Sequence, residues 1–219
     1  MPENPARRSI RSYVLRQGRT TPSQQRALDE LLPRFGISFS GSFLNMKEIF
    51  ERTAPVVLEI GSGMGETTAE IAHTSPQTDF IAIEVHGPGV GSLLKRIEAL
   101  ELKNLRVIRH DAVEVLERMI PEDSLAGIHL FFPDPWPKKR HRKRRLVQPP
   151  FAALAARKLA PGGYFHAATD WPEYAAQIDE VFSSSSSFEK ELRERKSRPT
   201  TKFERRGIGL GHPVRDLIF

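Results

Sequence analysis

The sequence predicts a doubly wound α/β fold with a Rossmann-like, mainly parallel sheet. Short apolar runs alternate with amphipathic segments of helical period, the first apolar run ends in a glycine-rich turn, and acidic residues stand where the apolar runs end. Parallel strands are buried on both faces and are therefore apolar throughout, whereas the crossover helices between them are amphipathic. This alternation is typical of right-handed βαβ units. A chain of 219 residues suits one such domain with a short appendage.

The first half of the chain predicts two strands and four helices. In order, these are helices at 24–32 and 43–52, a strand at 55–61, a helix at 66–73, a strand at 80–85 and a helix over 93–100. The run at 55–61 is nearly all apolar and ends in glycine, as a buried parallel strand does. In the last helix, Leu93, Leu94, Ile97 and Leu100 share one face, which predicts an amphipathic helix packed on the sheet.

The second half continues the alternation. Its expected elements are a strand at 105–109, a helix at 112–119, a strand at 127–132, a helix over 151–159, a strand at 163–168 and a helix at 172–182. Pro172 favours the start of the last helix, because proline suits the first turn of a helix. The five serines at 183–187 predict a loop, and residues 217–219 could close the sheet as an edge strand.

Composition limits the classes of protein that the chain can be. We expect a basic, partly mobile N-terminal extension over residues 1–35 and one domain over 36–219. The polar, arginine-rich tract at 1–19 does not resemble a secretory signal, and no apolar stretch approaches the roughly 18 residues of a membrane span. The absence of cysteine excludes disulfides, cysteine-bound zinc and thiol chemistry. The seven histidines are scattered without metal-ligand spacing, so we expect no metal partner. Because the sequence has neither a secretory signal nor a membrane span, we expect a cytoplasmic protein with no membrane partner.

A dense basic run indicates an anionic partner. The formal net charge is +6, and residues 138–145 (KKRHRKRR) carry seven of the positive charges in eight residues. A charge run is commonly only a solvated face. This one has no interleaved Asp or Glu to offset its self-repulsion, which favours binding to a polyanion such as RNA.

The turn after the first strand predicts a cofactor site. It contains Glu59, Gly61, Gly63 and Gly65 in a G-x-G-x-G pattern, which differs from the G-x-G-x-x-G of pyrophosphate-binding turns. Glycines allow a tight turn and a close approach of the backbone to a ligand. Glu59 would repel a phosphate and would suit an ammonium group, such as that of S-adenosylmethionine. The alternative is a purely structural turn.

Acids at the next strand ends extend this site, because ligands bind beyond the carboxyl ends of the strands in such sheets. Glu84 follows the second strand, where a carboxylate can accept the ribose hydroxyl protons of an adenosine. Asp111 follows the third strand and could meet the adenine amino group, although Asp111 and Glu114 also fit a helix capping box. Asp170 has the same two readings, as a site residue or as part of a helix start.

Asp134 has a stronger functional signal. It follows the fourth strand and is flanked by Pro133, Pro135 and Pro137, which rule out a conventional helix cap and favour a stiff, extended loop. A carboxylate in such a loop, beside the basic run, has little structural reason to be there. His129 and His166 lie within strand patterns and are expected to be core or near-core residues.

Together these segments resemble the bacterial tRNA (guanine-N7-)-methyltransferases, which are class I S-adenosylmethionine-dependent methyltransferases that modify guanine 46 in the variable loop. The resemblance spans about residues 11–219. Its segments are 58–65 (LEIGSGMG), 84–91 (EVHGPGVG), 131–141 (FFPDPWPKKRH), 168–171 (ATDW) and 198–204 (RPTTKFE). The segment at 131–141 is highly specific, while many methyltransferases share the glycine turn. Ser62 and Arg215 depart from the family pattern, which often has Phe and Trp at these positions.

The resemblance implies a role for each group of residues. The S-adenosylmethionine contacts would be Glu59, Glu84, Asp111 and Asp134, with Asp134 also the catalytic residue. The substrate contacts would be Lys138, Asp170, Thr201, Lys202, Phe203 and Glu204. The RNA contacts would be Arg140, His141, Arg142, Lys143, Arg144 and Arg145.

The expected activity is methyl transfer from S-adenosylmethionine to guanine N7 in tRNA, giving 7-methylguanosine. Guanine N7 has an in-plane lone pair, so the reaction needs no base to remove a proton, and catalysis would depend on positioning and electrostatics. Two other functions are a small-molecule methyltransferase, which the basic run disfavours, and a non-catalytic RNA-binding protein, which the acids at the strand ends disfavour. A monomer and a homodimer are equally compatible with the sequence.

Overall fold

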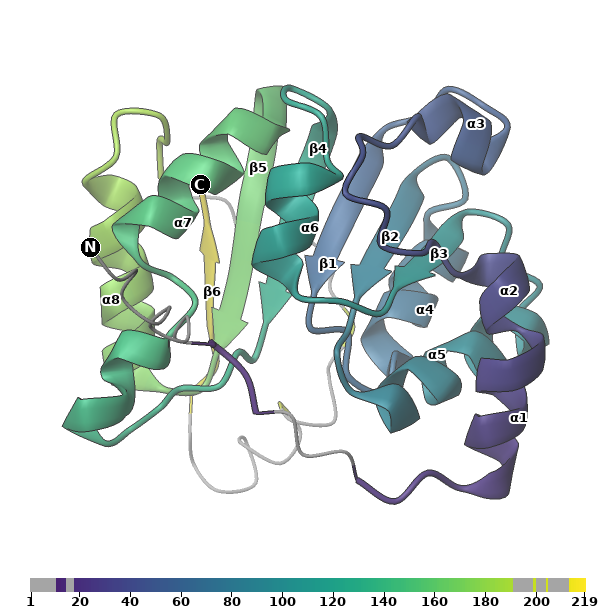
Figure 1. Cartoon of the computed structure of the whole chain (residues 1–219). Helices are drawn as coiled ribbons and strands as arrows, with labels where there is room; N and C mark the ends of the chain where they lie inside the picture. The colour runs from purple at the N-terminus through teal and green to yellow at the C-terminus, as the bar shows by residue number, and fades with distance from the viewer. Residues whose placement is uncertain (1–10, 15–17, 191–198, 200–203, 205–212) are drawn as a thin grey trace, which may run out of the picture.

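The computed structural model describes residues 11–14, 18–190, 199, 204 and 213–219. Its centre is a six-stranded sheet in the order β3-β2-β1-β4-β5-β6 (Figure 1). The first five strands are parallel and β6 pairs with β5 in the antiparallel direction. The strands are β1 (Val56–Ile60), β2 (Asp79–Ile83), β3 (Leu105–Ile108), β4 (Leu125–Phe131), β5 (Leu159–Thr169) and β6 (Arg215–Ile218). The predicted doubly wound fold and its edge strand are confirmed.

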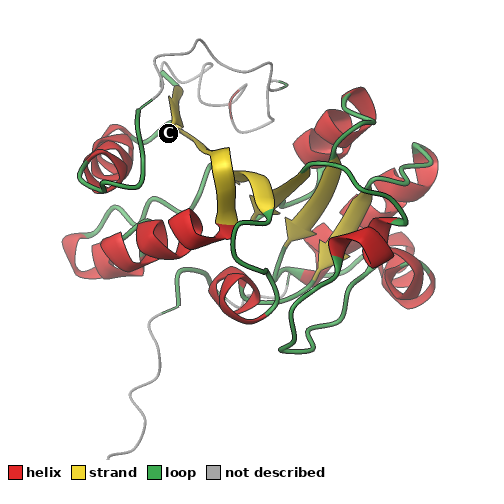
Figure 2. Cartoon of the chain, turned by 90° about the horizontal axis from the view of Figure 1, so that it is seen from above, coloured by secondary structure: helices red, strands yellow, loops and turns green. Residues whose placement is uncertain are grey.

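Helices cover both faces of the sheet (Figure 2). They are α1 (Pro22–Glu30), α2 (Leu32–Phe35), α3 (Met46–Phe50), α4 (Glu66–Thr74), α5 (Gly87–Ala99), α6 (Ala112–Arg118), the 3₁₀ helix η1 (Lys139–Arg144), α7 (Pro149–Lys158) and α8 (Pro172–Ser183). Side chains alternate across each strand, so Val57 belongs to the core that includes α1, α4 and α5, while its neighbour Leu58 belongs to the core that includes α6, α7 and α8. The sheet thus separates two apolar cores, and among the described residues no helix is long and apolar enough to cross a membrane.

The strand order reverses beside β1, and this reversal places the site. Ile60 at the end of β1 aligns with Ile83 of β2 on one side and with Leu130 of β4 on the other. The connections from β1 and β4 therefore leave the sheet at the same edge and diverge to opposite faces. A crevice for ligands forms at such a point.

Several predicted boundaries differ from the structure. Helix α5 begins at Gly87, ahead of the predicted 93–100, and Leu100 is its exposed C-cap rather than part of the packed face. Leu159, expected at the end of a helix, begins β5, which pairs with Leu125 across an irregularity in register and includes Gly162 at φ +77°. The helix expected at 43–52 covers only Met46–Phe50, because Asn45 caps its start and Glu51 ends it at φ +56°. The basic run forms η1, a helix that the charge pattern does not predict.

Helix α1 packs on the domain although it lies within the predicted extension. Thr21 and Gln24 form a capping box at its start, and Ala27 and Leu31 are buried. The backbone of Gln24 lies close to Gly91 of α5. A Cβ added to Gly91 would lie 2.7 Å from the Gln24 carbonyl oxygen. The domain boundary at residue 35 stays a prediction.

Candidate active site

The glycine turn after β1 needs glycine for two different reasons. Gly61, Gly63 and Gly65 have φ values of +75°, +57° and +75°, which side chains with a Cβ rarely adopt. A Cβ on Gly65 would also lie 2.5 Å from Leu93 of α5, whereas Cβ atoms on Gly61 and Gly63 would have no other atom within 4 Å. The last glycine therefore allows helix packing, and the first two leave open space beside the backbone.

Backbone N–H groups hold the carboxylate of Glu84. One oxygen accepts from Gly63 at 2.8 Å, and the other accepts from Val85 at 2.7 Å and from His86 at 2.8 Å. Three backbone donors to one carboxylate fix its orientation. A Cβ on Gly89 would lie 2.5 Å from the Gly63 carbonyl oxygen, so α5 packs directly on the turn that Glu84 supports.

Glu59 and Asp111 occupy the remaining predicted cofactor positions. Glu59 is buried within β1. Asp111 caps α6, where one carboxylate oxygen accepts from Val113 at 2.9 Å and from Glu114 at 3.1 Å. The capping interpretation of Asp111 is thus correct, and the Tyr13 side chain also hydrogen-bonds to the Asp111 carboxylate. Burial raises the pKa of Tyr13, and the negative charge of nearby Asp111 raises it further.

The loop after β4 is strained on both sides of Asp134. Phe132 and Trp136, two bulky aromatic residues, have φ values of +51° and +43°. Such conformations cost about 1–3 kcal/mol each and persist only where the surroundings enforce them. The N–H of Phe132 donates to the Ala168 carbonyl at 2.7 Å, which fixes the loop where it leaves the sheet.

Asp134 remains accessible to solvent at the tip of this loop. Desolvation by the surrounding protein raises the pKa of its carboxyl group, and the positive charge of Arg144 opposes that rise. The loop continues directly from β4, the neighbour of β1, so Asp134 and the glycine turn lie at the same edge of the sheet.

The basic run has an exposed part and a part that holds the loop. Residues 138–140, 142 and 143 are exposed. The guanidinium of Arg144 stacks on the Trp136 ring at 4.0 Å and donates to the carbonyls of Arg11 at 3.1 Å and Tyr13 at 2.8 Å. The Trp136 indole donates to the Ser12 carbonyl at 3.0 Å. Residues 11–14, the short purple segment in Figure 1, thus bind the loop after β4 at the carboxyl edge of the sheet.

Arg145 differs from the rest of the run. Its side chain is 2% exposed. Its Nε donates to the Pro135 carbonyl at 2.7 Å and its Nη1 donates to Gln177 at 2.7 Å. This burial does not support its predicted role as an RNA contact. The sequence does not distinguish Arg145 from its neighbours, because a charge run does not show which of its residues faces inward.

The other predicted substrate residues are only partly described. Asp170 follows β5 and is half-buried, and Trp171 rather than Asp170 is the N-cap of α8. Thr201, Lys202 and Phe203 lie outside the described residues, while Glu204 is buried. Sequence patterns do not reveal Tyr13 and Gln177, since neither lies in a chemical motif.

His129 and His166 are buried, as predicted. His129 contacts the Tyr164 hydroxyl at 2.9 Å, and His166 contacts Asp216 of β6 at 2.8 Å. Both pairs lie within the sheet rather than at its carboxyl edge. In the part of the chain that the structure describes, no group of three His, Asp or Glu side chains could hold a metal ion.

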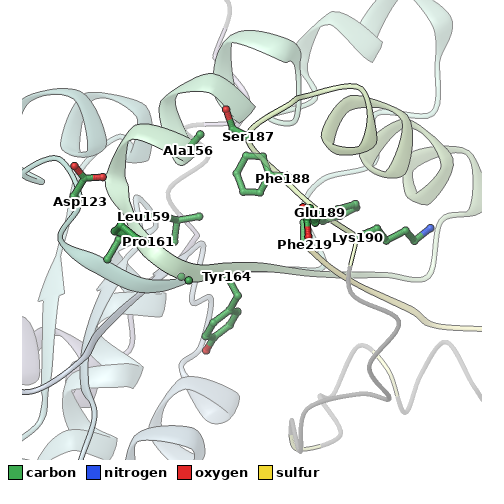
Figure 3. A pocket seen from close by; sticks show the side chains of 13 residues that line it. Asp123, Ala156, Leu159, Pro161, Tyr164, Ser187, Phe188, Glu189, Lys190 and Phe219 are labelled. Atoms are coloured by element: carbon green, nitrogen blue, oxygen red, sulfur yellow. The ribbon is translucent and has the colours of Figure 1, made fainter.

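A cavity of about 620 Å³ lies elsewhere, around the start of β5 and the loop before residue 190 (Figure 3). Leu159 and Pro161 line one side and Phe188 and Lys190 the other. None of the predicted site residues lines it. Since it adjoins the amino end of β5, it lies away from the carboxyl edge of the sheet.

Comparisons with known proteins identify the family of the chain. A family model described as "Putative methyltransferase" matches residues 53–217. The chain is 55% identical over 222 residues to the tRNA (guanine-N(7)-)-methyltransferase of Chromobacterium violaceum, covering 99% of this chain and 98% of the relative. It is 55% identical over 223 residues to the enzyme of the same name from Nitrosospira multiformis, covering 100% and 97%.

A solved structure supports the fold. The 16S rRNA methyltransferase KamB matches with a TM-score of 0.56 and 18% identity, over 81% of this chain and 93% of that one. At this identity the likeness concerns the fold alone. The full-length sequence matches are much closer, and on their evidence the chain belongs to the family of tRNA (guanine-N(7)-)-methyltransferases.

Proposed function

We propose that the protein transfers a methyl group from S-adenosylmethionine to N7 of guanine 46 in the variable loop of tRNA, giving 7-methylguanosine. The observation that carries the proposal is the position of Asp134. It lies in a strained loop at the same edge of the sheet as the open glycine turn, the edge at which open α/β sheets bind their ligands. We further propose that the reaction takes place in the cytoplasm.

The described residues fit S-adenosylmethionine. The open space at Gly61 and Gly63 admits a ligand against the backbone, and the oriented carboxylate of Glu84 suits ribose hydroxyls. Glu59 would hold the ammonium group, and the Asp111 carboxylate would accept from the adenine amino group. When bound, the cofactor supplies a methyl group on a sulfonium, which is a good leaving group.

Asp134 acts in this proposal through its charge. Guanine N7 attacks with a lone pair that needs no deprotonation, and the product ring carries a positive charge. The Asp134 carboxylate would stabilise that charge as it develops and would hold the base in line with the methyl group. An accessible carboxylate at the tip of a restrained loop suits this role.

The substrate would lie along the exposed part of the basic run. Residues 138–143 present six cationic or titratable side chains on η1 and just before it, suited to the phosphates of a folded RNA. Lys138 and Asp170, together with residues 201–204, are proposed to contact the target nucleotide. The base must leave its stack to reach Asp134.

The direct test is a methylation assay. The protein is incubated with S-adenosylmethionine and a tRNA transcript, and nucleosides are separated after digestion. We expect 7-methylguanosine with a transcript that has guanine at position 46 and none with adenine there. A product other than 7-methylguanosine, or equal labelling of the two transcripts, would contradict the proposal.

A further inference from the structure

The catalytic loop needs a restraint near Asp134. Phe132 and Trp136 bracket it with left-handed backbone conformations, which relax unless neighbouring groups enforce them. The Phe132 N–H restrains the first end through the Ala168 carbonyl. On the other side of Asp134, the restraint is at the Pro135 carbonyl.

That restraint is Arg145. Its Nε donates to the Pro135 carbonyl at 2.7 Å from a side chain that is 2% exposed. The guanidinium lies over the Tyr174 ring at 4.9 Å, and its Nη1 donates to Gln177 at 2.7 Å. A buried cation is costly to leave without partners, so these contacts fix where Arg145 lies.

Helix α8 orients the partners of Arg145 in turn. Gln177 accepts from Arg145 through its oxygen and donates through its nitrogen to the Val147 carbonyl at 2.8 Å. The Tyr174 hydroxyl accepts from the Val147 N–H at 3.2 Å. Both the N–H and the carbonyl of Val147, two residues beyond Arg145, are therefore hydrogen-bonded to side chains of α8.

We infer that Arg145 is a positioning residue that holds the Pro135 carbonyl and thereby aims the Asp134 carboxylate at the reacting base. The inference rests on the proposed role of Asp134. It assigns Arg145 to catalysis rather than to RNA binding, unlike the exposed residues of the same run. Lysine could not replace it, since one ammonium lacks the planar fork that reaches Pro135 and Gln177 together.

The first test compares Arg145→Lys with Lys143→Gln, an exposed change in the same run. For Arg145→Lys we expect kcat to fall by about ten- to a hundredfold, since small misplacements of a reacting group have large effects. The KM for tRNA and the salt dependence of tRNA binding should stay as in the wild type. Lys143→Gln should instead raise the KM for tRNA and weaken the salt dependence of tRNA binding, while kcat at saturating tRNA stays as in the wild type. A wild-type kcat with a weaker salt dependence in Arg145→Lys would overturn the inference and make Arg145 an RNA contact.

A double-mutant cycle separates positioning from general stability. If Arg145 acts through Asp134, then adding Arg145→Lys to Asp134→Asn should lower kcat no further, because residues that act as a unit are not additive. Independent, multiplying effects would overturn the inference. A wild-type rate in Asp134→Asn alone would instead contradict the proposed function of Asp134.

A second variant covers the case in which Arg145→Lys does not fold. Gln177→Met keeps the side-chain volume and Arg145 but removes the acceptor for Nη1. We expect a several-fold lower kcat with unchanged binding of tRNA and of S-adenosylhomocysteine, at a temperature well below the melting point of the variant. An unchanged kcat in this variant would overturn the inference.

Discussion

The two halves of the candidate site are built differently. Around β1 and β2, the backbone makes the site: glycines shape the turn, and N–H groups of residues 63, 85 and 86 hold Glu84. Around β4, side chains hold the loop that carries Asp134: Arg144 stacks on Trp136, Arg145 donates to the Pro135 carbonyl, and the Trp136 indole donates to the distant Ser12 carbonyl. A site made from local backbone tolerates most side-chain changes nearby, whereas a loop held by side chains depends on each of them.

The largest expected effect in the catalytic half is that of Asp134→Asn. This change keeps the shape and removes the charge, so kcat should fall by about two orders of magnitude, as when one well-placed electrostatic interaction is removed. Binding of tRNA should change little, because phosphate contacts dominate it. Single-turnover kinetics with saturating cofactor would measure this. If most of the activity remained, Asp170 would be the next acid to test.

The matching change in the cofactor half is Glu84→Gln. The amide would place its N–H₂ group against N–H donors that now point at a carboxylate, so affinity for S-adenosylhomocysteine should fall by about tenfold or more. The tRNA affinity should be unaffected. Calorimetric titration would measure the binding, with the exposed Glu66→Gln as the control. In the same preparation, S-adenosylhomocysteine should raise the melting temperature and NAD should not.

A smaller effect is expected from the exposed part of the basic run. Replacing Lys139, Arg140 and Lys143 by Gln should weaken tRNA binding and reduce its salt slope by up to about one unit for each phosphate that these side chains neutralise. The affinity for S-adenosylhomocysteine and kcat at saturating tRNA should stay as in the wild type. Filter binding at several salt concentrations would show it. An unchanged slope would mean that these side chains form only a solvated face.

The smallest effect concerns pH. Because burial raises the pKa of Asp134, the active carboxylate should be lost on acidification at a higher pH than an ordinary aspartate. Activity should therefore be flat between about pH 6.5 and 8.5, since no base is needed, and fall below that range. The residual activity of Asp134→Asn should lack this acid limb. If the wild type and Asp134→Asn lost activity around the same acidic pH, the group that titrates there would be a residue other than Asp134.

The same contrast explains how much the sequence predicts. The succession of strands and helices, the glycine turn, the position of Glu84 at a strand end and the irregular loop around Asp134 follow from local patterns, because apolar runs and prolines act on their immediate neighbours. The burial of Arg145 and the contact of Ser12 with Trp136 do not, since the partners lie 10 and 124 residues apart and no local pattern records the pairing. For Asp111, a capping motif coincides with the proposed ligand position, so the pattern alone could not separate the two interpretations.

The contact between Ser12 and Trp136 has a consequence for assembly during synthesis. Residues 11–14 leave the ribosome early, but their partners Trp136 and Arg144 follow more than 120 residues later, and Gln177 of α8 later still. The glycine turn and its support from Glu84 can form from the first half of the chain alone. Contacts of long sequence separation form late and slowly. Nascent chains should therefore acquire the cofactor turn well before they can hold Asp134 in place, and catalytic competence should be the last property that the growing protein gains.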